Sequence, residues 1–155
     1  RHEVTTEGGL DIISQEAKLK KAIDRFTDAG IISSVFIDAE PAQIEAAARI
    51  GARVCEIHTG PYAHAFHAAG RDAEAPAVLA ELNKIRTAGE VVRSLGMRFN
   101  AGHALNYYNV EPIARLHGIR ELHIGHAIVS RAVFVGLRAA VAEMKRLMRE
   151  AAQQT

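Results

Sequence analysis

Short apolar runs alternate with segments of helical periodicity along the sequence, and this alternation restricts the chain to few folds. Four of the apolar runs are predicted strands: residues 31–37, 53–58, 97–101 and 121–125. Helical spacing of apolar residues predicts helices over residues 14–29, 40–50, 72–95, 109–117, 131–136 and 137–152. Strands that are each followed by a helix, with short connections, are typical of a parallel sheet with crossover helices.

Two α/β architectures fit this pattern, a small doubly wound sheet and a part of a TIM (β/α)8 barrel. A whole barrel needs roughly 200 residues or more, and this chain has 155. The chain also begins without Met and without a strand before its first predicted helix. We therefore expect residues 1–155 to be the C-terminal part of a single TIM-barrel domain, holding about its last four strand–helix units. The doubly wound sheet is the alternative.

Composition excludes several classes of function. The chain is 48% hydrophobic and 24% charged, with a net charge of +1, as expected of a globular protein with one core. Lys and Arg are spread along helical segments, so nothing indicates nucleic-acid binding. The apolar runs are too short to cross a bilayer, and no signal-peptide pattern is present. The single cysteine, Cys55, is predicted to be a buried thiol, and we expect a cytoplasmic protein.

Two neighbouring predicted strands end in the same motif, a glycine followed by a histidine. The two stretches are residues 100–105 (Asn-Ala-Gly-His-Ala-Leu) and residues 123–128 (His-Ile-Gly-His-Ala-Ile). Glycine brings backbone N–H groups close to a ligand, and the start of a following helix favours a phosphate or carboxylate. The two copies therefore predict one site, in which backbone holds an anion and imidazole transfers a proton.

Polar side chains at the carboxyl ends of the predicted strands are the candidates for this site, because parallel α/β proteins carry their sites there. These residues are Asp38, Glu56, His58, Asn100, His103 and His126. Residues 59–62 are predicted to leave the second strand as a loop, and residues 63–73 show no periodicity.

Glu56 and His58 alternate onto the same face of their strand. Two interpretations of Glu56 stay open, a catalytic carboxylate and a structural ion pair, with His58 as a possible hydrogen-bonding partner. His103 is the candidate proton donor, and His123 is predicted to fill the interior or to support the site. Because HExxH, His-x-His and CxxC patterns are absent from the sequence, a metal site is the weaker interpretation.

Six stretches, in order along nearly the whole chain, resemble the pyridoxine 5′-phosphate synthase family: residues 3–11, 35–38, 56–60, 100–103, 124–128 and 140–148. The resemblance implies a TIM-barrel transferase of vitamin B6 biosynthesis. Such an enzyme condenses 1-deoxy-D-xylulose 5-phosphate with 3-amino-2-oxopropyl phosphate to give pyridoxine 5′-phosphate, phosphate and water. It implies a homo-octamer that needs no metal or organic cofactor.

Residue roles also follow from the resemblance. His103 matches the family's proton donor, and Glu56 matches a carboxylate that stabilises the transition state. Thr5, Gly125 and His126 match substrate-binding residues, and Ala104 stands where the family usually has a glycine whose N–H contacts phosphate. The family's other two catalytic residues, a histidine and a glutamate on early strands, have no counterpart in this sequence. A non-catalytic phosphate-ligand-binding barrel fragment and a metal-dependent barrel hydrolase therefore stay as alternatives.

Overall fold

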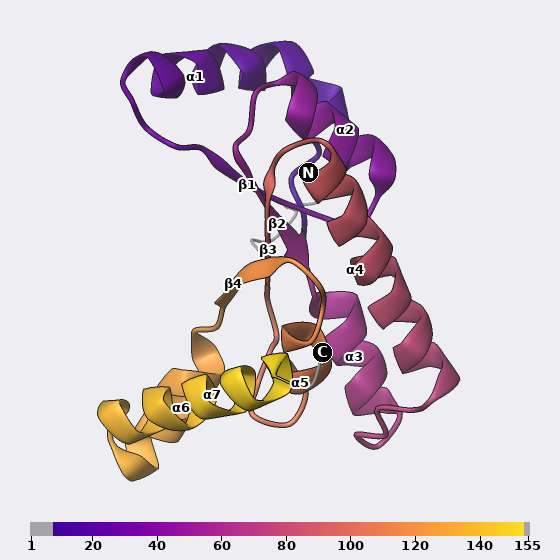
Figure 1. The fold of residues 1–155 in the computed structure, drawn as a ribbon, viewed down its shortest axis with the longest axis vertical. Coiled ribbons are helices and arrows are strands. Elements are labelled where there is room, and N and C mark those ends of the chain that lie inside the picture. Colours follow the sequence, from indigo (N-terminus) through magenta and orange to yellow (C-terminus); the bar gives the residue numbers. More distant parts are fainter. Residues whose placement is uncertain (1–7, 154–155) are drawn as a thin grey trace, which may run out of the picture.

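The computed structural model describes residues 8–153 and has an α/β architecture (Figure 1). A short 3-10 helix, η1, precedes the first α-helix. The elements in chain order are η1 (Ile13–Gln15), α1 (Glu16–Asp28), β1 (Ser34–Ile37), α2 (Pro41–Arg49), β2 (Val54–His58), α3 (Gly60–Ala68), α4 (Pro76–Ser94), β3 (Arg98–Gly102), α5 (Val110–Ala114), β4 (Ile119–His123), α6 (His126–Val135) and α7 (Leu137–Ala152).

The four strands form one parallel sheet in the order β1-β2-β3-β4, so each strand pairs with the strand before it in the sequence. This arrangement confirms the predicted parallel sheet. One irregularity interrupts the register, between Phe99 and Asn100 on β3. Helices connect the strands, as parallel pairing requires, because the chain must return to the same end of the sheet before each new strand.

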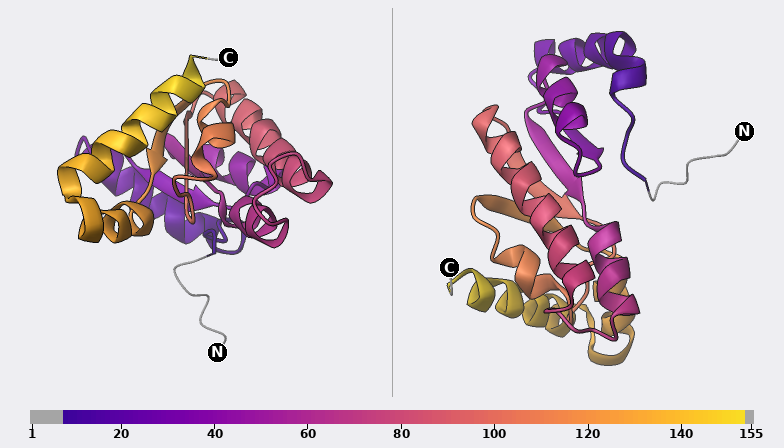
Figure 2. Two further views of the ribbon diagram at one scale, coloured as in Figure 1. Left: turned by 90° about the horizontal axis from the view of Figure 1, so that it is seen from below. Right: turned by 90° about the vertical axis from the view of Figure 1, so that its right-hand side faces the viewer.

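The two faces of the sheet have different surroundings. Helices α2 and α4 pack on the face that carries Ile37, Ile57 and Phe99, which are almost fully buried. Figure 2 shows α4 running along the sheet. The other face carries partly buried residues such as Phe36 and Glu56, because side chains alternate along each strand. The hydrophobic core therefore lies between the sheet and its helices.

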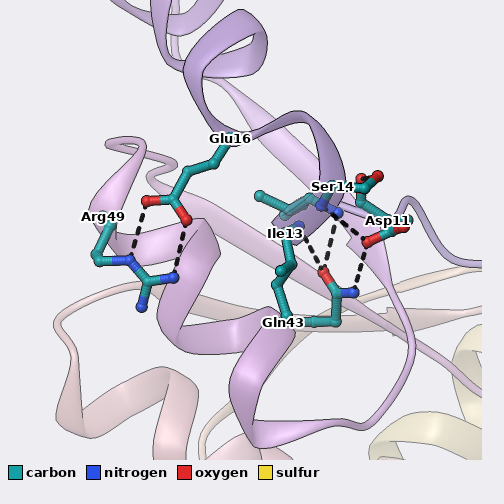
Figure 3. Close-up of polar contacts among 7 residues, drawn as sticks. Asp11, Ile13, Ser14, Glu16, Gln43 and Arg49 are labelled. Atoms are coloured by element: carbon teal, nitrogen blue, oxygen red, sulfur yellow. Dashed lines mark hydrogen bonds and ion pairs between the residues drawn. The ribbon is translucent and has the colours of Figure 1, made fainter.

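Polar contacts attach the first helices to α2 (Figure 3). The side-chain oxygen of Gln43 accepts a hydrogen bond from the Ile12 N–H at 2.9 Å, and its amide donates to Asp11 at 3.0 Å. Arg49 donates to both carboxylate oxygens of Glu16, at 3.0 and 2.9 Å. The Arg49 guanidinium lowers the pKa of Glu16, because it stabilises the ionised carboxylate.

At the other end of the chain, α6 and α7 pack against each other, and α7 also packs on α5. Tyr107 donates a hydrogen bond to the Ala140 carbonyl at 2.9 Å, which ties the loop after β3 to α7. No residue of α6 is buried, and Val133 and Phe134 are 78% and 85% exposed. An apolar surface therefore remains open on α6.

Several boundaries differ from those predicted. Residues 60–68 form helix α3 rather than a loop, because Tyr62 and Phe66 lie one helical turn apart and are both buried. The α4 helix begins at Pro76 rather than near residue 72, since a residue before proline disfavours helical backbone. Strand β4 and helix α6 each begin earlier than expected, and Gly125 directly precedes the helix instead of ending the strand.

Candidate functional site

The carboxyl ends of the four strands lie along one edge of the sheet, since the strands are parallel and paired in chain order. The register places Glu56 of β2 beside Asn100 of β3, and Asn100 beside Glu121 of β4. Asn100 donates from Nδ2 to Oε2 of Glu121 at 3.1 Å. A row of polar side chains therefore crosses three strands on the sheet face that α2 and α4 leave open.

The carboxylate of Glu56 reaches across β3 to a histidine of β4. Its Oε2 lies 2.6 Å from Nδ1 of His123, and the two side chains are 18% and 42% exposed. Gly102 of β3 makes this possible, because a Cβ there would collide with Oε1 of Glu56 and crowd His123. The suggested partnership of Glu56 with His58 is therefore wrong. His123 supports Glu56, in line with the supporting role predicted for it.

His58 pairs instead with the aspartate at the end of β1. Its Nδ1 lies 2.8 Å from Oδ1 of Asp38, and its side chain is only 10% exposed. Because a carboxylate can only accept, Nδ1 carries a proton in this pair. Nε2 is buried, has no hydrogen-bond partner among residues 8–153, and lies against Gly60, where any Cβ would clash with it.

His103 follows β3 directly and lies beside His58. The two ring centroids are 5.0 Å apart in an edge-to-face arrangement, and the Phe36 ring is 6.0 Å from the His103 ring. These histidines help to line an open pocket of about 460 Å³, together with Gly60, Pro61, His64 and Ala104. The strand ends thus bring the candidate proton donor, His103, to a pocket that can hold a small ligand.

The backbone at His103 and Ala104 is in an unusual conformation. Their φ angles are +87° and +57°, in the region that favours glycine, and this costs a residue with a side chain about 1–2 kcal/mol. The Ala104 carbonyl accepts a hydrogen bond from the Asn109 side chain at 3.2 Å. Glycine adopts positive φ without this cost, so Ala104 is a strained residue in this turn.

The other predicted binding residues lie apart from this pocket or outside the described chain. Gly125 is the residue before α6, and His126 opens that helix with an exposed side chain. Among residues 8–153, no hydrogen bond or ion pair joins either of them to Glu56 or His103. The N–H groups of the first turn of α6 lack helical partners, as at any helix start. Thr5 lies outside the described residues.

Sequence reasoning missed two buried polar residues that hold the turn after β3. The Thr59 hydroxyl lies 2.6 Å from the carbonyl oxygens of both Gly102 and His103, and Asn109 holds the next carbonyl. Both side chains are almost fully buried. Threonine and asparagine in loops are ordinarily exposed, so the only available signal was the position of Thr59 directly after His58.

Comparison with known proteins identifies the family of this chain. The family model described as pyridoxal phosphate biosynthesis protein PdxJ matches residues 1–150. The chain belongs to this family. A pyridoxine 5′-phosphate synthase of Azoarcus sp. is 84% identical over 152 residues, which are 98% of this chain and 61% of the relative.

More distant members of the PdxJ family match over the same extent. The proteins named pyridoxine 5′-phosphate synthase from Dechloromonas aromatica and Rhodopirellula baltica are 80% and 51% identical, over 99% and 96% of this chain. The matches cover 61% and 57% of those relatives, so the chain spans about three-fifths of the curated relatives' length.

Two further observations concern the described part of the chain. Within residues 8–153, no group of three or more His, Cys, Asp or Glu side chains is arranged to hold a metal ion. No helix in the same range has both the length and the apolar character needed to cross a membrane.

Proposed function

We propose that the chain is part of a pyridoxine 5′-phosphate synthase, a transferase that condenses 1-deoxy-D-xylulose 5-phosphate with 3-amino-2-oxopropyl phosphate. The products are pyridoxine 5′-phosphate, phosphate and water. The observation that carries the proposal is the gathering of Glu56, His58 and His103 at the ends of adjacent parallel strands. The PdxJ family match over residues 1–150 and the names of the relatives support it.

The chemistry of this condensation suits the groups at the strand ends. Imine formation, loss of water and ring closure all need repeated proton transfers. His103 is the proposed proton donor, because it lines the pocket and carries an imidazole. Glu56 is the proposed stabilising carboxylate, since it is mostly buried and held by His123.

Both substrates carry phosphate, and backbone N–H groups are the proposed ligands for it. The Ala104 carbonyl is bonded to Asn109, while the Ala104 N–H donates to no acceptor among residues 8–153. Backbone N–H groups exposed in a turn can form a concavity that binds anions. Gly125 and His126, at the start of α6, are proposed to contact the aminooxopropyl phosphate, and Thr5 the deoxyxylulose phosphate.

The proposed fold of the complete enzyme is a TIM barrel, of which this chain supplies about the last four strand–helix units. Strands in strict chain order favour a barrel over a doubly wound sheet, because doubly wound sheets reverse their strand order at a switch point. Helices on one face and polar side chains on the other also fit a barrel wall. A cytoplasmic homo-octamer without metal or organic cofactor is part of the same proposal.

A chimera tests the proposed activity. The 152 matched residues of the Azoarcus relative are replaced by the corresponding residues of this chain, and pyridoxine 5′-phosphate is measured by chromatography with both substrates present. Formation of the product after exhaustive chelation is the expected result. A folded chimera that binds the phosphorylated substrates without turnover would overturn the proposal in favour of a binding protein. Activity that disappears on chelation and returns with zinc would favour a metal-dependent enzyme.

A further inference from the structure

The turn that carries His103 is held by hydrogen bonds to three consecutive carbonyl groups. The carbonyl of Gly102 accepts from the Thr59 N–H at 2.8 Å and from the Thr59 hydroxyl at 2.6 Å. The carbonyl of His103 accepts from the same hydroxyl at 2.6 Å. The carbonyl of Ala104 accepts from Nδ2 of Asn109 at 3.2 Å. All three carbonyls are therefore fixed by two buried residues.

The two buried residues are themselves fixed by their surroundings. Asn109 accepts a hydrogen bond from the Asn106 N–H at 2.7 Å, and its carbonyl accepts from the Tyr62 hydroxyl at 3.0 Å. Tyr62 belongs to α3 and is fully buried, and burial raises the pKa of its hydroxyl to about 12. Thr59 immediately precedes α3. The whole set of contacts thus connects α3 to the turn after β3.

The Thr59 hydroxyl acts where the backbone is strained. His103 and Ala104 both have positive φ without being glycines, and such conformations persist only where the surroundings hold them. A threonine hydroxyl has a single hydrogen, which is shared between the Gly102 and His103 carbonyls. If that hydrogen is removed, both carbonyls lose a buried partner and the strained turn can relax.

We propose that Thr59 is a positioning residue, whose hydroxyl holds the strained turn and thereby fixes the His103 imidazole against His58. The inference rests on the proposed function of His103 as proton donor. Proton transfer is sensitive to misplacement of the donor by about 1 Å. Thr59 therefore acts on the rate of proton transfer through the backbone of His103, without needing to contact a substrate.

Two substitutions at this position separate the hydroxyl from the volume of the side chain. Thr59→Val keeps the shape and removes the hydroxyl, whereas Thr59→Ser keeps the hydroxyl and removes a methyl group. In the full-length chimera, Thr59→Val is expected to lower kcat roughly ten- to a hundred-fold with a much smaller change in KM. Thr59→Ser is expected to retain most of the kcat that Thr59→Val loses, although serine lacks the methyl group that valine keeps.

Equal losses of kcat in the two variants would overturn the inference, because the loss would then not depend on the presence of the hydroxyl. An unchanged kcat in folded Thr59→Val would overturn it as well. NMR of the His103 imidazole, assigned by its loss in His103→Gln, gives a readout that is independent of activity. Its resonances should shift in Thr59→Val and stay in place in Thr59→Ser.

The same NMR measurement distinguishes the two proposals. If the unsubstituted chimera makes no pyridoxine 5′-phosphate, the proposed function fails, and the imidazole resonances still decide whether Thr59 positions His103. If turnover is present and the resonances are identical in both Thr59 variants, the positioning role fails while the proposed function stands.

Discussion

At the scale of single residues, the missing side chain at Gly102 decides which groups meet at the site. Gly102 lies on the strand between Glu56 and His123, and any Cβ there would meet the Glu56 carboxylate. The carboxylate is therefore free to cross β3 and pair with a histidine two strands away. A buried carboxylate needs such a partner, because an unpaired buried charge is costly.

Glu56→Gln should fold normally and react slowly. The glutamine oxygen can still accept a hydrogen bond from His123, so we expect little change in the melting temperature. Loss of the negative charge should lower kcat roughly a hundred-fold, as for other removed electrostatic stabilisers. The matched control is Glu121→Gln, which removes an exposed carboxylate near the same histidine. A destabilised Glu56→Gln protein with normal turnover per folded molecule would identify a purely structural ion pair.

His103→Ala should lower kcat by roughly a hundred-fold or more, because a general acid is lost. Alanine at this position has to adopt the same positive φ as histidine does, so the conformation of the turn should persist. The affinity for phosphate ligands, measured by calorimetry, should therefore change little. His117→Ala, at an exposed position after α5, is the control. Weak ligand binding with an unchanged kcat at saturating substrate would make His103 a binding residue.

The sequence predicted which side chains lie at the strand ends, but it predicted their partners less well. Alternation placed Glu56 and His58 on one face correctly. The partner of Glu56, His123, comes from β4, two strands away, and the partner of His58, Asp38, follows the neighbouring strand β1. Such pairs depend on register and on the space left by a glycine, and neither property can be derived from local spacing.

At the scale of elements, helix α3 supports the site from the side of β2. It positions Thr59 at its start and Tyr62 in its first turn. The sequence did not reveal this helix, because its nine residues repeat their apolar spacing only once and include two exposed histidines. The longer amphipathic helix α7 was predicted with correct limits, since sixteen residues display the pattern several times.

Strand β2 buries Cys55 completely, and burial raises the pKa of its thiol from 9.0 to about 12. Between these pH values, the unfolded chain releases a proton that the folded chain retains. The free energy of unfolding should therefore fall as pH rises from about 9, with a slope approaching 1.4 kcal/mol per pH unit.

Urea unfolding of the full-length chimera between pH 8 and 11 measures this slope, and Cys55→Ala is the control. Both proteins retain Tyr62, whose raised pKa of about 12 also contributes above pH 10. The difference between the two slopes therefore belongs to the thiol. Parallel curves for the two proteins would contradict burial of Cys55 in solution.

At the scale of the whole molecule, the sheet leaves β1 and β4 as edge strands within the described residues. Its open face carries partly buried side chains, and α6 exposes Val133 and Phe134. Open strand edges and exposed apolar surfaces favour association between chains. These features are those expected of a part of a barrel wall.

Residues 1–155 by themselves should therefore form dimers or larger aggregates, or remain partly unfolded, rather than a stable monomer. Sedimentation velocity and thermal unfolding of the isolated chain test this prediction. Phe134→Ser distinguishes the two surfaces, because it should weaken association through α6 and leave pairing through strand edges intact. A monodisperse monomer with one sharp transition would instead favour the doubly wound sheet.

The order of the strands also has a consequence for how the chain folds during synthesis. Because each strand pairs with the strand made just before it, every β-pairing is available as soon as the next strand–helix unit has left the ribosome. None of the three pairings within residues 8–153 has to wait for a distant partner, and pairing between strands that are near in sequence costs little chain entropy. The growing chain can therefore extend its sheet one unit at a time, in the order in which it is translated.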